Sequence, residues 1–337
     1  MYLKELTGLS GVPGAENDVL EFIFDKIKDN CDEIYRDSIG NLIAVNRCGK
    51  TNPKKVMVCA HMDEVALIIT KITDEGFLKF DTLGGIDTSV LVSKKVLVGS
   101  NALHGVIGAK AIHLQKKEER TKGLKMEELY IDIGAGDKET AQKNVSIGDY
   151  AVFDSHYVEF GNGLVKAKAL DDRLGCDILI DLSKRRYDYD LYLVFTAQEE
   201  TGLRGAKVAV NRINPDLAMV LETTACSDTF GSEEKDYSTR LGEGVVLSFA
   251  DLRTYYSKEI LKDVVKVATK YGIPYQFKKT VSGGNDAGVV HTSCGGIKTI
   301  TMSVPVRYIH SPSSVMSKSD FDAMKKLCEK YLEEVTL

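Results

Sequence analysis

The sequence has no tryptophan, only six prolines among 337 residues, and no long apolar run. A membrane-spanning helix needs roughly 18 or more consecutive apolar residues, and no stretch approaches that length. Met1 leads directly into the polar pair Lys4–Glu5, without the charged start and apolar stretch of a secretory signal. We therefore expect a protein that is neither inserted in a membrane nor exported.

An excess of basic residues is also missing, since 44 lysines and arginines face 49 aspartates and glutamates, for a net charge of −5. Proteins that follow nucleic-acid phosphates carry the opposite balance, so we expect no nucleic-acid partner. The hydrophobic fraction of 43% and the charged fraction of 28% are typical of a globular protein with a sizeable core. The length predicts about two domains.

The seven cysteines are scattered and odd in number, and none forms a Cys-x-x-Cys pair. This pattern disfavours both a disulfide framework and a thiolate zinc site. Small core residues in a reducing compartment explain such cysteines, so we expect a cytoplasmic protein.

Runs of β-forming residues are what the sequence does have. They occur at 56–60 and 191–195, with similar runs at 217–221, 245–249 and 297–304. Strands that are apolar on both faces belong inside a covered sheet.

Segments with helical periodicity lie before and between these runs. We expect helices at 16–28, 173–186 and 258–271, and a final helix beginning near Ser319. Alternating strands and helices predict a layered α/β domain.

Residues 67–165 follow a different pattern, with short Val/Ile-rich stretches broken by many glycines. Closely spaced strands with turn signals favour a small β-barrel or sandwich. We therefore predict an α/β domain made of 1–66 plus 166–337, with a β-rich domain inserted at 67–165.

His61 and Asp63 directly follow the run at 56–60. A spacing of two sends both side chains to one face of an extended segment. His61 could bind a metal while Asp63 orients its imidazole. The alternative is an ordinary histidine in a turn.

Asp171 and Asp172 form a second acidic position after an apolar stretch. Adjacent carboxylates repel each other, which costs stability unless a cation compensates. Asp172 can equally be explained as a helix N-cap. Asp171 is the better candidate ligand.

Glu199 and Glu200 follow the strand expected at 191–197. One could bind a metal and the other could act as a general base. A solvated pair of glutamates in a loop is the alternative.

Glu222 follows the run at 217–221, and His310 follows the run at 297–304. Each alone could be an ordinary core or surface residue. Together with the other three positions, they place histidines and carboxylates at several strand ends, a pattern that predicts a hydrolytic site with two metal ions.

These residues lie in recognisable strings, namely CAHMDEVA, KALDDRLG, TAQEETGLRGA, SGGNDAG and VPVRYIHSPSSV. In this order they resemble the glutamyl/deblocking aminopeptidases, metallopeptidase family forty-two, which include the tetrahedral aminopeptidases. The resemblance covers nearly the whole chain.

The resemblance implies a role for each position. His61 would bind the first metal and Asp63 would hold its imidazole. Asp171 would bridge both ions, with a cis peptide bond to Asp172.

Glu199 would be the general base, and Glu200 and His310 would complete the second metal site. Glu222 stands where the family usually has aspartate. The longer side chain can still bind, so Glu222 is expected to be the remaining ligand of the first metal.

The implied protein is an aminopeptidase that removes the N-terminal residue of short peptides, with a metal-bridging water as nucleophile. Its cofactors would be two divalent ions, zinc or cobalt, with manganese as a third option. The implied fold is a mixed sheet covered by helices on both faces. Its inserted domain would help to build a homo-oligomer from dimers, up to a tetrahedral dodecamer.

Two rival functions remain open from the residues alone. Paired carboxylates also serve glycosidases, but His61 and His310 would then have no role, and tryptophan is missing for sugar stacking. A non-catalytic assembly or metal-storage protein is the other. The preferred N-terminal residue is not defined, although a cation in the pocket, from Arg240, Arg253 or Arg307, would favour an acidic one.

Overall fold

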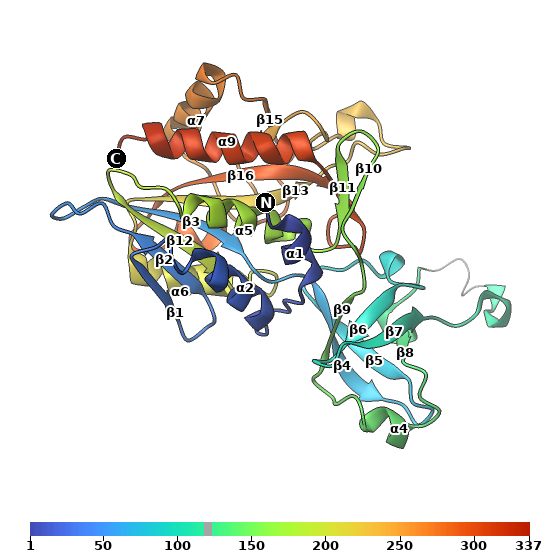
Figure 1. The fold of residues 1–337 in the computed structure, drawn as a ribbon. Coiled ribbons are helices and arrows are strands. Elements are labelled where there is room, and N and C mark those ends of the chain that lie inside the picture. Colours follow the sequence, from blue (N-terminus) through green and yellow to red (C-terminus); the bar gives the residue numbers. More distant parts are fainter. Residues whose placement is uncertain (118–122) are drawn as a thin grey trace.

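The computed structural model describes residues 1–117 and 123–337, which form a large sheet and a small barrel (Figure 1). Eleven of the described strands make the large sheet, which is mixed because antiparallel strands flank a parallel centre. Across the sheet they are β1 (Glu33–Arg36), β2 (Leu42–Asn46), β12 (Asp190–Thr196), β3 (Lys55–His61), β13 (Leu217–Ala225), β16 (Lys298–Arg307), β17 (Ser314–Ser317), β11 (Leu164–Ala167) and β10 (Val158–Phe160). β14 (Val245–Leu247) pairs with β16, and β15 (Tyr275–Phe277) pairs with β14.

The four central strands β12, β3, β13 and β16 run parallel to one another. The runs expected as strands at 56–60 and 191–195 form β3 and β12, and almost every side chain in both is buried. This confirms that strands apolar on both faces lie inside the covered sheet. Because the strands are parallel, their carboxyl ends meet at one edge, where open α/β sheets bind ligands.

Three strand ends differ from the prediction. The strand expected at 297–304 continues to Arg307. The strand expected at 217–221 continues to Ala225, because the β-branched pair Thr223–Thr224 extends its pairing with β16. The strand expected at 245–249 ends at Leu247.

Helices cover both faces of the sheet, as expected (Figure 1). On one face α5 packs across β3 and β13, with α1, α2 and α9 beside it, and α6 and α8 pack on the other face. The helices are α1 (Leu3–Gly8), α2 (Asn17–Ile27), α5 (Leu170–Leu182), α6 (Arg204–Ile213), α7 (Lys258–Lys270), α8 (Ala287–Val290) and α9 (Lys318–Glu334). The expected helices 16–28, 173–186 and 258–271 correspond to α2, α5 and α7, and the final helix to α9.

The second unit is a closed barrel in the strand order β4-β5-β8-β7-β6-β9. Its elements are β4 (Ala66–Ile72), β5 (Leu78–Leu83), β6 (Lys95–Val98), β7 (Leu103–Gly108), β8 (Tyr130–Asp132), β9 (Tyr150–Phe153) and the short helix α4 (Lys138–Gln142). Side chains such as Ile69, Val96 and Ile131 fill its core. The expected barrel-like fold of the insertion is confirmed.

The barrel strands end at Phe153, before the end of the expected segment 67–165. β10 pairs with β11, and β11 pairs with β17, so both strands belong to the large sheet. Their hairpin contains two glycines, a turn signal that looks the same in either sheet. The division into a catalytic and an oligomerisation domain stays a prediction.

Among the described residues, no helix has both the length and the apolar character needed to cross a membrane. All seven cysteines lie within the described ranges, and none is in a disulfide.

The start of α6 packs so closely on the end of β12 that position 205 has room only for glycine. A Cβ on Gly205 would lie 2.3 Å from the Ala197 carbonyl oxygen and 2.3 Å from Asn41 Oδ1. Asn41 is held there, because Oδ1 accepts from the Ala197 N–H and Nδ2 donates to the Gly205 carbonyl, both at 2.9 Å. We expect Gly205→Ala to lower the free energy of unfolding by about 1–3 kcal/mol, as overpacking does.

Urea denaturation measures this loss. Gly8→Ala is the matched control, since no atom lies within 4 Å of a Cβ placed on Gly8. Gly8→Ala should not lose stability, and equal losses in both variants would contradict the close approach.

Candidate metal and active site

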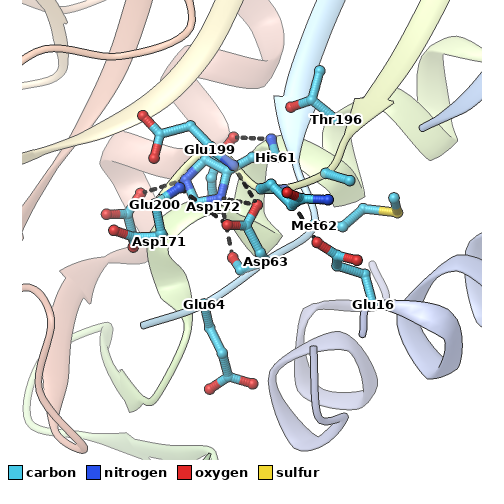
Figure 2. A network of polar contacts seen from close by, with 12 residues as sticks. Glu16, His61, Met62, Asp63, Glu64, Asp171, Asp172, Thr196, Glu199 and Glu200 are labelled. Atoms are coloured by element: carbon cyan, nitrogen blue, oxygen red, sulfur yellow. Dashed lines mark hydrogen bonds and ion pairs between the residues drawn. The ribbon is translucent and has the colours of Figure 1, made fainter. Parts of the chain in front are cut away.

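The predicted site residues meet at the carboxyl edge of the central strands, in a cleft of about 520 Å³. That volume lies within the range of roughly 300–1,000 Å³ found for small-molecule sites. The predicted residues that line it are His61, Asp171, Glu199, Glu200, Glu222 and His310. Asp63 lies beneath them and is fully buried (Figure 2).

The carboxylate of Asp171 lies between the two histidines. Its Oδ1 is 3.3 Å from His61 Nε2, and its Oδ2 is 3.2 Å from His310 Nε2. The side chains fall into three overlapping groups whose ligand atoms lie within 4.8 Å of one another, His61–Asp171–Glu222, Asp171–Glu200–His310 and His61–Glu199–Glu200. Asp171 is shared by the first two. Each group combines one imidazole with two carboxylates and could hold a metal ion.

His61 is the last residue of β3, and its position is fixed at both ring and backbone. Its backbone N–H donates to Asp172 Oδ2 at 3.3 Å, and its Nδ1 donates to the Asp63 carbonyl at 3.0 Å. Nε2 is thereby left to face the cleft. Asp172 also accepts from the Gly175 N–H at 3.1 Å, as an N-cap does. The peptide bond between Asp171 and Asp172 is cis, as the family resemblance implied.

Asp63 has a contact that the sequence did not predict. Its two carboxylate oxygens accept from the backbone N–H groups of Glu199 and Glu200, each at 3.0 Å (Figure 2). The same carboxylate lies 3.6 Å from His61 Nδ1, farther than the Asp63 carbonyl. The structure therefore has Asp63 holding the turn that carries both glutamates.

Glu16 is a buried residue of the site region that the sequence analysis missed. Its Oε1 accepts from the Gln198 N–H at 3.1 Å and from the Gly14 N–H at 2.7 Å. The residue just before Glu199 is therefore fixed from the N-terminal segment. Glu16 precedes α2, and nothing in its local sequence distinguishes it from a helix-flanking acid.

The sequence predicts that Glu222 follows the end of its strand, but in the structure Glu222 lies within β13. The register pairs Val220 with Cys59, so Glu222 comes level with His61 two residues further on. Glu222 Oε1 lies 3.6 Å from His61 Nε2. The longer side chain at the position where the family usually has aspartate therefore still reaches the site.

Several residues beside the site have left-handed backbone conformations although none is glycine. They are Ala169, Gln198, Leu203, Tyr308 and His310, with φ values of 51°, 57°, 59°, 58° and 58°. Such conformations cost about 1–3 kcal/mol each and persist only where the surrounding structure holds them. Four of them, Ala169, Gln198, Tyr308 and His310, lie at or within two residues of a predicted site residue.

The predicted residues that line the cleft include four carboxylates and only two histidines. Burial, and then the other acids, raises the pKa of Glu200 to about 7 and that of Glu222 to about 8. Although burial opposes its charge, Asp171 and Glu200 raise the pKa of His310 to about 9. Burial thus favours the protonated form of these two glutamates, and a bound cation would favour the ionised form.

The donor set fits a divalent cation. Glu200 Oε1 is buried and accepts no hydrogen bond from any described residue, although His310 Nε2 lies 3.3 Å away. Buried carboxylate oxygens normally have a partner, and a missing ion is one explanation for an orphan. Imidazole and carboxylate ligands suit zinc, cobalt and manganese.

The comparisons with known proteins agree with this geometry. Residues 40–327 match the profile of the M42 glutamyl aminopeptidases. The chain belongs to this family. It is 39% identical over 327 residues to the "Putative aminopeptidase" of Acetivibrio thermocellus, with 96% of each chain covered.

Two solved structures are similar to this chain over nearly its full length. The aminopeptidase APDkam598 of Desulfurococcus kamchatkensis is 34% identical, with a TM-score of 0.94 and coverage of 99% of this chain and 94% of that one. The TET1 peptidase of Pyrococcus horikoshii, which can assemble into a tetrahedron or a large octahedral shell, is 34% identical, with a TM-score of 0.87 and coverage of 99% and 98%. The chain is a peptidase of this family, as predicted.

The turn that carries His310 is anchored by an ion pair. Arg307 lies three residues before His310, and its Nε and Nη2 each donate to Asp228 at 2.8 Å. Although burial opposes ionisation, this contact lowers the pKa of Asp228 from its ordinary 3.8. A lowered folded-state pKa gives stability that is present above about pH 4 and is lost as the pH falls further.

Asp228→Asn should therefore unfold at a lower temperature than wild type at pH 7, with a gap that shrinks as the pH falls below 4. Thermal unfolding followed by circular dichroism from pH 2 to 8 measures this gap. Asp29→Asn, at an exposed position of the same charge, should show no gap. A difference for Asp228→Asn that did not vary with pH would contradict the ion pair.

Proposed function

We propose that this M42 peptidase is a metal-dependent aminopeptidase that removes the N-terminal residue of short peptides, with two ions in one site. The observation that carries the proposal is the position of Asp171, whose two oxygens face the two histidines. A carboxylate shared by two ligand groups is what a dinuclear site requires.

His61, Glu222 and Asp171 would hold one ion, and Asp171, Glu200 and His310 would hold the other. The ions, zinc or cobalt with manganese as a third option, would polarise the scissile carbonyl and make the attacking water more acidic. Proton transfer and the positioning of the general base are assigned to side chains of the protein.

Glu199 lines the cleft beside these groups and serves as the general base. It takes the proton of the attacking water and returns it to the leaving amine, so that it ends the cycle ionised. Asp63 keeps it in reach through the bond to its backbone N–H, and Glu16 does the same for the preceding residue.

The cleft also carries two cations that suit an acidic N-terminal residue. Arg253 and Lys278 both line it, and neither forms an ion pair with another described residue, although Lys278 Nζ donates to the Ser282 carbonyl at 2.7 Å. Asp251, the acid beside them, already accepts from the Arg253 and Thr254 N–H groups and from the Tyr256 hydroxyl.

The Arg253 side chain is held by its stem. A Cβ on Gly284 would lie 2.5 Å from Arg253 Cγ, so the arginine packs directly on glycine backbone. Of the other arginines considered, Arg240 pairs with Glu234 and Arg307 pairs with Asp228. We propose a preference for N-terminal glutamate or aspartate.

The M42 peptidase is proposed to form a dimer-built homo-oligomer through its inserted barrel, in the cytoplasm. The similarity to the TET1 peptidase supports an assembly, up to a tetrahedral dodecamer. The barrel exposes large apolar side chains, including Ile112 at 69% and Ile147 at 67%, which burial between subunits would cover. The free cysteines agree with a reducing compartment.

The test of the proposed function is release of amino acids from short peptides with free or acetylated N-termini. Protein stripped of metal is assayed before and after zinc or cobalt is restored. Release that needs metal and a free N-terminus supports the proposal. Cleavage of acetylated peptides, or release unaffected by stripping, would overturn it.

Glu199→Gln should keep its metal and lose activity by about 10²–10⁴-fold in kcat, the usual contribution of a general base. Metal content by atomic absorption and steady-state kinetics measure the two effects separately. Glu259→Gln, at an exposed position on α7, should change neither. Activity of Glu199→Gln near that of wild type would rule out this base.

Arg253→Met keeps the apolar stem and removes the charge. It should lower kcat/KM for peptides with N-terminal glutamate by about 10-fold or more, because hydrogen bonds to charged groups contribute about 1.5–3 kcal/mol. Peptides with N-terminal leucine should be cleaved as before, and Arg253→Lys should retain part of the preference. An equal loss for both peptides would contradict the assigned contact.

A further inference from the structure

The inserted barrel reaches the candidate site through one turn. Gly84 and Gly85 directly follow β5, and the Gly85 carbonyl oxygen accepts from His310 Nδ1 at 2.8 Å. The two residues are 225 positions apart in the chain. The turn is therefore a contact between the barrel and the half of the site formed by Asp171, Glu200 and His310.

This contact determines which nitrogen of His310 faces the site. A carbonyl can only accept, so Nδ1 carries a hydrogen, and in the neutral ring the lone pair is on Nε2, the nitrogen that faces the site. Nε2 points to Asp171 at 3.2 Å and to Glu200 at 3.3 Å. A ligand histidine commonly donates its other ring N–H to a carbonyl, which fixes the ring and the tautomer.

Gly84 packs against the second ligand of the same half-site. Its φ is +87°, and a Cβ there would lie 2.8 Å from Val65 Cγ1 and 3.0 Å from Glu200 Oε2. Only glycine fits both the backbone conformation and the space. The turn thus contacts His310 through Gly85 and packs against Glu200 through Gly84.

We propose that the Gly84–Gly85 turn of the barrel is a positioning element for the half-site of Asp171, Glu200 and His310. The affinity of that half-site for its ion then depends on how the barrel is placed, whereas the half-site of His61 and Glu222 is independent of it. The inference rests on the proposed metal centre and assigns the barrel a role in it besides assembly.

Gly84→Ala in the full-length protein tests this role, with Gly134→Ala as the matched control. Gly134 is also in the inserted segment and has a φ of +75°, but no atom lies within 4 Å of a Cβ there. Both variants carry the backbone cost, and only Gly84→Ala presses on Glu200. Stripped protein is titrated with Co²⁺ by calorimetry and visible absorption, with thermal unfolding in parallel.

We expect Gly84→Ala to bind one of the two ions about 10–100-fold more weakly, as loss of such supporting contacts does, and the other ion as in wild type. Gly134→Ala should bind both ions normally. Unchanged binding in Gly84→Ala, or equal weakening of both ions, would overturn the proposal. Wild-type protein that takes up fewer than two ions would overturn the metal centre itself, and this inference with it.

If Gly84→Ala does not fold, Val65→Ala combined with Gly84→Ala carries the same test. The double variant removes the contact with Val65 and keeps the one with Glu200. It should show the same selective weakening of one ion, and normal binding of both would overturn the proposal.

Discussion

The constraint on which this structure depends is the burial of several carboxylates around Asp171 at a single sheet edge. Burial disfavours the charged form of a carboxyl group and nearby like charges add to this cost, which is why the pKa values of Glu200 and Glu222 are raised. The two histidines offset only part of this cost, and Glu200 Oε1 accepts no hydrogen bond from a described residue that would lower it further. A pair of divalent cations would neutralise this buried negative charge, so we expect metal binding to stabilise this edge of the sheet.

The fold meets this constraint by holding the site residues through their backbones. Asp63 accepts from the N–H groups of both glutamates, Asp172 accepts from that of His61, and Glu16 accepts from the residue before Glu199. Three acids close to the site therefore support it without facing the cleft. The parallel strands bring the segments together, and the barrel adds a contact from outside the sheet.

The sequence predicts the α/β core well, because unbroken apolar runs such as 56–60 leave few alternatives to a central strand. It places the end of the barrel poorly, since the glycine turns of β10 and β11 are the same signal in either sheet. Tertiary contacts were beyond it altogether. Neither the Asp63 bonds to the glutamate turn nor the Gly85 bond to His310 leaves a local pattern, because each joins segments more than 100 residues apart.

Anomalous diffraction from crystals of the stripped protein loaded with Co²⁺ is the most direct test of the central claim. The account predicts two peaks that share the Asp171 carboxylate, one beside His61 and Glu222 and the other beside Glu200 and His310. A single peak, or peaks away from Asp171, in protein that cleaves peptides would contradict it.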